Sequence, residues 1–266
     1  MEKYFPCFTL LNQYYTCMFP KSKLLPAVIT FTLCYAILHL AIFFVMQPGS
    51  GPYLWMETQL GKNPLEWLAL LFIVQEVILL CLVVLQFRVY AHHVHWKNIV
   101  HFFKEQLHWK WWKLALHVVG WALLMYFVIN TILLIIIQMY GIHIPGLFGE
   151  QLIVSALSEL PLTTWWQKVL LFLGVGIIGP FVEEIMYRGF LTKLLTQAVG
   201  ARWVIIAAAL FALSHMERGV VGNLFILALL LWYVYHKTQS MRYSFLFHVV
   251  INSMALGVLF FAEGIQ

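Results

Sequence analysis

Runs of about 20 consecutive apolar residues recur along this chain, and they constrain its fold more than any other feature. A helix of that length spans the hydrocarbon core of a bilayer and satisfies its own backbone hydrogen bonds there. Of the 266 residues, 62% are hydrophobic and only 10% are charged. We therefore predict an all-α polytopic membrane protein with about seven transmembrane helices and a C-terminal catalytic helical core. The predicted spans are Leu24–Met46, Trp67–Phe87, Leu114–Met139, Val169–Pro180 with the stretch directly after it, Trp203–Met216, Val220–His236 and Tyr243–Phe261.

Lysine and arginine are distributed unevenly over the predicted connections. They gather in 87–113, 188–202 and 236–242, whereas 47–66 and 140–167 contain few of them. Because cytoplasmic connections of membrane proteins are enriched in these residues, we expect a cytoplasmic N-terminus and a C-terminus on the outside. The net charge of +5 is therefore interpreted as a topology signal and not as a sign of nucleic-acid binding.

One predicted connection, residues 88–113, is rich in histidine, lysine and tryptophan. Tryptophan and lysine beside two spans are typical of an amphipathic helix at the headgroup level, which is the interpretation we prefer. A metal site is the alternative, with these candidate ligands: His92, His93, His95, His101 and His108. We divide the chain into N-terminal scaffold helices, residues 1–164, and a C-terminal core, residues 165–262, where the polar chemistry concentrates.

The most unusual polar residues within a span lie in FVEEIMYRGF, residues 181–190. An ionised side chain in hydrocarbon costs at least ~2.5–3.5 kcal/mol, so these residues need partners or a function. Glu184 and Arg188 are four residues apart and face each other, whereas Glu183 lies about 100° away around the helix without a matching cation. The preceding glycines and Pro180 predict a weakened or broken helix, and Pro180 is suited to the first turn of a new helix, with both glutamates then near its positive end.

Two further pairs at helical spacing follow in later spans. Phe211 and His215 share a face in ALFALSHMERG, and His248 and Asn252 are four residues apart in FLFHVVINS. Each pair has an ordinary explanation, such as a histidine bonded to a carbonyl group or an asparagine joining two helices. Together with a free glutamate, however, they are the groups that hydrolytic chemistry uses.

Helix geometry predicts which of these residues meet. If the helix with Glu183 turns near Gly200 and the next helix runs back antiparallel, Glu183 and His215 lie equally deep, each about 24 Å from the turn. His248 follows the basic connection at 236–242 closely, so simple topology places it shallower by ~10 Å. A connection that starts deep, or a tilt of the helix with Glu183, would remove this offset.

In their order and spacing, the motifs EEIMYR, FALSH and HVVIN resemble those of the CPBP family of intramembrane proteases. This family includes the CAAX-processing protease of eukaryotes and bacterial proteins linked to bacteriocin maturation or self-immunity. The resemblance covers residues 165–262 and implies a CPBP-like protease core there. We expect an integral protein of a bacterial plasma membrane.

The resemblance implies a role for each matching residue. Glu183 would be the catalytic glutamate, and His215 would help to hold and activate water. His248 and Asn252 would stabilise the oxyanion. Amide hydrolysis needs a base for water and donors where the oxyanion forms, and these residue types can supply both. The supporting residues would be Glu184, Arg188 and Phe211.

The family is classed among the metalloproteases, but these residues do not by themselves require a metal. A catalytic zinc ion takes about three protein ligands and a water molecule. Glu183, His215 and His248 could be those ligands, but the remaining carboxylate, Glu184, is already paired with Arg188. The chain also lacks a His-Glu-x-x-His motif. We therefore expect water activation with no required cofactor, and zinc is the alternative.

The predicted function is an intramembrane endopeptidase whose partners are the lipid bilayer and a membrane-anchored or hydrophobic peptide substrate, with no nucleic acid. One alternative is a non-catalytic immunity or scaffold relative, which would have no need to bury an unpaired Glu183. A transporter would better explain Glu76 beside Gln75 in the second span. Transporters usually show related halves with matching broken helices, however, and this sequence predicts one such break.

Overall fold

The computed structural model describes residues 21–46, 64–90, 112–140, 165–192, 204–215 and 221–262, with a few isolated positions between them. In these ranges the chain forms seven continuous helical runs and no strand, which confirms the all-α class. Each run lies within a few residues of a predicted span. The runs are α2 (Lys21–Met46), α4 (Pro64–Tyr90), α6 (Trp112–Tyr140), the joined elements α8 to η3 (Trp165–Leu191), α11 (Val204–Leu213), α12 (Val221–Thr238) and α13 (Met241–Ala262). Most of the predicted interfacial segment 88–113, with all its histidines, lies outside the described residues.

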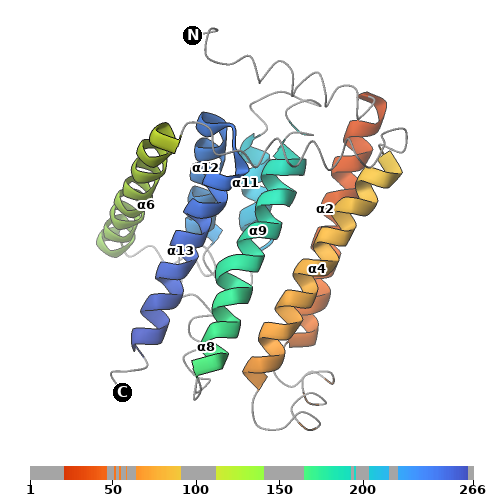
Figure 1. The fold of residues 1–266 in the computed structure, drawn as a ribbon, viewed down its shortest axis with the longest axis horizontal. Coiled ribbons are helices and arrows are strands. Elements are labelled where there is room, and N and C mark those ends of the chain that lie inside the picture. The colour runs from red at the N-terminus through yellow and green to blue at the C-terminus, as the bar shows by residue number, and fades with distance from the viewer. Residues whose placement is uncertain are drawn as a thin grey trace.

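The helices lie side by side in one bundle, with α6 at one edge and α2 and α4 at the other (Figure 1). One buried apolar cluster joins α2, α4, α9, η3, α11 and α12, and a second cluster joins α6, α12 and α13. The run that contains α9 packs against α4 on one side and α13 on the other. The stretch with the two adjacent glutamates therefore lies inside the bundle.

Helix α6 contacts the rest of the bundle through a narrow stripe of small residues. Its buried side chains, Ala115, Val118 and Ala122, follow each other at helical spacing, and most of its other apolar side chains are exposed. An apolar helix exposed in this way fits a lipid environment. By length and composition, two described helices could each cross a membrane, Trp112–Tyr140 and Trp165–Leu191. That all seven runs are membrane spans stays a prediction.

The helical run that begins at Trp165 continues through Pro180, so of the two predicted outcomes the helix is weakened there and not broken. The run consists of α8 (Trp165–Leu171), the π-helical η2 (Phe172–Ile178), α9 (Gly179–Glu184) and the π-helical η3 (Ile185–Leu191). The glycines and the proline weaken the α-helical hydrogen bonds, and the chain responds by widening its turns rather than by ending the helix. Glu183 and Glu184 consequently lie in the middle of a long helix and not at a positive end.

Helix α13 approaches the π-helical segment η2 at a glycine. A β-carbon added to Gly176 would lie 3.2 Å from the ring of Phe172 and 3.5 Å from Leu256 on α13. The missing side chain lets α13 pack closely against the run that carries the glutamates. This packing matters because α13 also carries His248.

Candidate active site

Three of the predicted residues meet inside the bundle. Nε2 of His215, in the turn after α11, lies 3.3 Å from Oε1 of Glu183 on α9. Nε2 of His248, on α13, lies 3.6 Å from Oε2 of the same carboxylate. All three side chains are buried. Residues far apart in the sequence thus bring two imidazoles to one carboxylate.

The offset of ~10 Å that simple topology gave for His248 is absent, because His248 contacts Glu183 directly, as the alternative of a connection that starts deep allowed. Two features account for the difference. The connection before α13 consists of Gln239 and Ser240 alone, and Ser240 is fully buried, so the connection starts inside the protein. The residues after Glu183 are π-helical, and a π-helix uses more residues for each turn than an α-helix does.

Glu184 pairs with Arg188, as the spacing predicted. Oε1 of Glu184 lies 3.0 Å from Nη1 of Arg188, and both side chains are exposed by 2% or less. The same oxygen lies 3.3 Å from Nδ1 of His248. Nη2 of Arg188 donates to the backbone oxygen of Ala228 on α12, at 3.2 Å. Both ring nitrogens of His248 therefore face carboxylates, and His248 connects the two glutamates.

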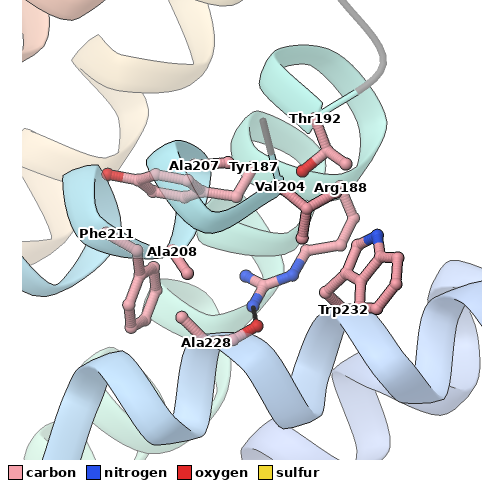
Figure 2. Close-up of a pocket in the computed structure, with 9 residues that line it drawn as sticks. All are labelled: Tyr187, Arg188, Thr192, Val204, Ala207, Ala208, Phe211, Ala228 and Trp232. Atoms are coloured by element: carbon pink, nitrogen blue, oxygen red, sulfur yellow. Dashed lines mark hydrogen bonds between the residues drawn. The ribbon is translucent and has the colours of Figure 1, made fainter. Parts of the chain in front are cut away.

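Phe211 belongs both to the site and to the wall of a neighbouring pocket. Its ring centroid lies 4.8 Å from that of His215 and 5.9 Å from that of His248. The guanidinium of Arg188 lies over the same ring at 5.3 Å. Figure 2 shows this guanidinium reaching between α11 and α12 toward the carbonyl of Ala228, in a small pocket. The other residues that line the pocket are Tyr187, Thr192, Val204, Ala207, Ala208 and Trp232.

The hydrogen bonds of His215 determine which of its ring nitrogens faces Glu183. Nδ1 lies 2.7 Å from the backbone oxygen of Phe211. A carbonyl oxygen can only accept, so Nδ1 carries the proton of this bond. Nε2 then faces Oε1 of Glu183, and an attractive contact between these atoms needs one proton between them. Glu183 and His215 therefore share an exchangeable proton, which is what general acid–base catalysis requires.

Asn252 bonds to the backbone of the π-helical segment η2. Its Nδ2 donates to the carbonyl oxygen of Val175 at 2.9 Å. Near the end of η2, the N–H of Gly179 bonds to the oxygen of Gly174, five residues back. The next bond in this pattern would join residue 180 to Val175, but Pro180 has no N–H. Asn252 supplies the missing donor, and its amide retains a second hydrogen for other partners.

We expect Asn252→Ala to lower the free energy of unfolding by about 1–3 kcal/mol, because the carbonyl of Val175 loses its donor. Thermal melting of the purified protein measures this loss. In a Pro180→Ala background, residue 180 brings its own N–H, so the same substitution should cost less. Identical melting temperatures for Asn252→Ala and the wild type would show that the bond does not stabilise the fold.

Two further residues, for which no role was predicted, contribute to the site: Ser214 and Tyr35. Oγ of Ser214 lies 3.0 Å from Nδ1 of His215, and the hydroxyl of Tyr35 lies 3.1 Å from Oγ of Ser214. The available signals were a serine next to a motif histidine and a tyrosine inside the apolar first span. Glu76 and Gln75 on α4 are also buried, and both take part in polar or electrostatic interactions within the protein.

Among the described side chains, no three from His, Cys, Asp and Glu are grouped so that they could hold a metal ion as they stand. The carboxylate of Glu183 instead contacts His215 and His248 directly, at distances close to those of hydrogen bonds. A zinc ion, the alternative cofactor, would be held by these same three residues.

A buried carboxylate beside two imidazoles, enclosed by apolar helices, is consistent with a catalytic site within a membrane. Residues 164–254 match the family model of the Rce1-like type II CAAX prenyl endopeptidases. This part of the chain is therefore a domain of that protease family, within the CPBP proteases that the three motifs resemble. The match includes every residue predicted for the site, and α2, α4 and α6 lie outside it.

Comparisons with curated proteins and with solved structures give no significant match. The family match and the two long apolar helices together make this an integral membrane protein.

Proposed function

We propose that this chain is an intramembrane endopeptidase that hydrolyses membrane-anchored or strongly hydrophobic peptides. The observation that supports it most is the contact of Glu183 with His215 and His248 inside a domain of a protease family. Because these groups are buried among apolar helices, a peptide held in the bilayer reaches them more readily than a folded soluble protein does. A prenylated peptide that ends in a CAAX sequence is the first substrate to test, since the matched family carries that description.

In the proposed reaction, the proton shared by Glu183 and His215 stays on Nε2 of the imidazole, and a water molecule beside them gives a proton to the carboxylate while its oxygen bonds to the carbonyl carbon of the substrate. His248 and the remaining amide hydrogen of Asn252 stabilise the oxyanion that forms. The C–N bond then breaks, and Glu183 returns the proton to the leaving amine. The products are a carboxylic acid and an amine, so Glu183 ends the cycle as it began.

The test is cleavage of a synthetic farnesylated CAAX peptide by the purified full-length protein in lipid nanodiscs, followed by mass spectrometry. A hydrophobic transmembrane peptide and a folded soluble protein serve as comparison substrates. We expect cleavage of the anchored peptides and none of the soluble protein. If the wild type cleaves neither anchored peptide, the result supports the non-catalytic alternative. If it cleaves the soluble protein and ignores the anchored peptides, the site does not take its substrates from the bilayer.

Chelators should leave turnover unchanged, because the proposed reaction activates water with Glu183 and His215. The measurement compares the cleavage rate before and after treatment with EDTA and phenanthroline, and determines the zinc content of the same samples by elemental mass spectrometry. Loss of activity that follows the loss of zinc, and returns when zinc is added, would replace this mechanism with a zinc-dependent one.

The proposed location is a bacterial plasma membrane, with the N-terminus in the cytoplasm. This orientation is supported by the lysines and arginines that gather in alternate connections of the predicted topology.

A further inference from the structure

Tyr35 lies outside the matched domain and yet reaches the candidate site. It belongs to α2, and its buried hydroxyl lies 3.1 Å from Oγ of Ser214, next to His215 in the sequence. The hydroxyl of Tyr187, from η3, lies 3.2 Å from the same oxygen. Ser214 is thus the point where hydroxyls from two distant parts of the chain meet beside the imidazole of His215.

The hydroxyl of Ser214 can donate one hydrogen bond, and the distances indicate which atom accepts it. Oγ of Ser214 lies 2.7 Å from the carbonyl oxygen of Phe211 and donates to it. The two tyrosine hydroxyls occupy the acceptor positions of this oxygen. Ser214 therefore cannot draw the proton on Nδ1 of His215 away from Phe211, although the two atoms are only 3.0 Å apart.

Without the hydroxyl of Tyr35, an acceptor position on Ser214 becomes available to Nδ1–H. The imidazole of His215 could then turn from the carbonyl of Phe211 toward Ser214. Because Nε2 lies opposite Nδ1 on the ring, such a turn also moves Nε2 relative to Glu183. A catalytic group displaced by a fraction of an ångström loses much of its effect on the reaction.

Packing holds the ring of Tyr35 in place. It stacks with Phe31 at a centroid distance of 6.1 Å and meets Tyr187 edge to face at 5.8 Å. Phe31 packs in turn against Phe190 of η3, at 5.3 Å. These ring contacts hold the hydroxyl of Tyr35 in the position where it bonds to Ser214.

We propose that Tyr35 is a positioning residue of the active site, which acts through Ser214 to hold His215 with Nδ1 on Phe211 and Nε2 on Glu183. The inference rests on the proposed function and adds to it that the N-terminal helices complete the site of the matched domain. His215 and Glu183 contact the reacting atoms. Tyr35 does not, and it acts on them indirectly, through Ser214 and His215.

Tyr35→Phe removes the hydroxyl and keeps the ring, so it should lower kcat by about 10-fold to 100-fold, the usual cost of losing a partner that orients a functional histidine. KM for the farnesylated CAAX peptide should stay unchanged, because Tyr35 does not contact substrate. The effect should also be absent in a Ser214→Ala background, since the route from Tyr35 to His215 is already cut there. The matched control is Tyr243→Phe, which alters a buried tyrosine of the other apolar cluster and should leave kcat unchanged.

A second measurement is independent of activity. Nitrogen-15 NMR of histidine-labelled protein, with the signals of His215 assigned by their loss in His215→Gln, reports which ring nitrogen carries the proton. We expect Nδ1 of His215 to be protonated and hydrogen-bonded in the wild type and altered in Tyr35→Phe. Unchanged His215 signals in Tyr35→Phe, or an equal loss of kcat in Tyr243→Phe, would overturn the proposal. If the wild type cleaves no peptide, the proposed function fails, but the NMR result still decides whether Tyr35 positions His215.

Discussion

Glu183→Gln should lower turnover by about 10²–10⁴ and leave the protein folded. Glutamine has the shape of glutamate, and its amide can still donate to Nε2 of His215, so the contact inside the bundle is retained. It cannot accept a proton from water, and the reaction therefore loses its base. The cleavage rate of the farnesylated peptide measures the first effect, and the melting temperature in detergent measures the second.

The matched control is Glu76→Gln, which changes a buried glutamate of α4 in the same way. We expect Glu76→Gln to keep its turnover, because Glu76 has no part in the proposed reaction. A loss of turnover confined to Glu76→Gln would show that cleavage depends on Glu76 and not on Glu183. Wild-type turnover in Glu183→Gln would end the hypothesis that this glutamate is the base.

Most of the contacts that could be predicted from the sequence are set by one helix. Glu184 and Arg188 are four residues apart, and Phe211 and His215 are likewise four apart, so helical spacing alone places each pair together. The seven helical runs were predictable for a related reason, since apolar runs of membrane length are visible without any tertiary information. Across helices, equal depth predicted that Glu183 and His215 meet, and they do.

Where the structure differs from the prediction, the π-helical turns contribute in each case, and for His248 the buried connection before α13 contributes as well. The π-helical turns of η2 and η3 are not visible in hydropathy, and they changed both the expected break at Pro180 and the expected depth of His248. The bond from Asn252 to Val175 is a consequence of the same π-helical geometry. Tyr35 reaches Ser214 across 179 positions of sequence, and no local pattern could predict that contact.

Glu184→Gln should lower the stability of the protein more than its turnover. This result would distinguish the role of Glu184 from that of Glu183. The substitution leaves the guanidinium of Arg188, exposed by only 2%, without its carboxylate. Removing one partner of a fully buried ion pair costs up to ~3–5 kcal/mol, because the other charge stays buried and unneutralised. We expect a clear fall in melting temperature and in yield from the membrane, in contrast to Glu183→Gln.

The double variant Glu184→Gln with Arg188→Met is the control for this interpretation. If the cost of Glu184→Gln comes from the stranded charge, removing that charge should recover much of the stability, since an apolar side chain often replaces a buried ion pair at little cost. Because membrane proteins often unfold irreversibly, all variants are compared at one heating rate. If Glu184→Gln has the same melting temperature as the wild type, the hydrogen bond of Arg188 to Ala228 and its contact with Phe211 are enough to stabilise the buried guanidinium. If the double variant is stable but inactive, Glu184 and Arg188 act on catalysis through His248, whose Nδ1 has then lost its carboxylate.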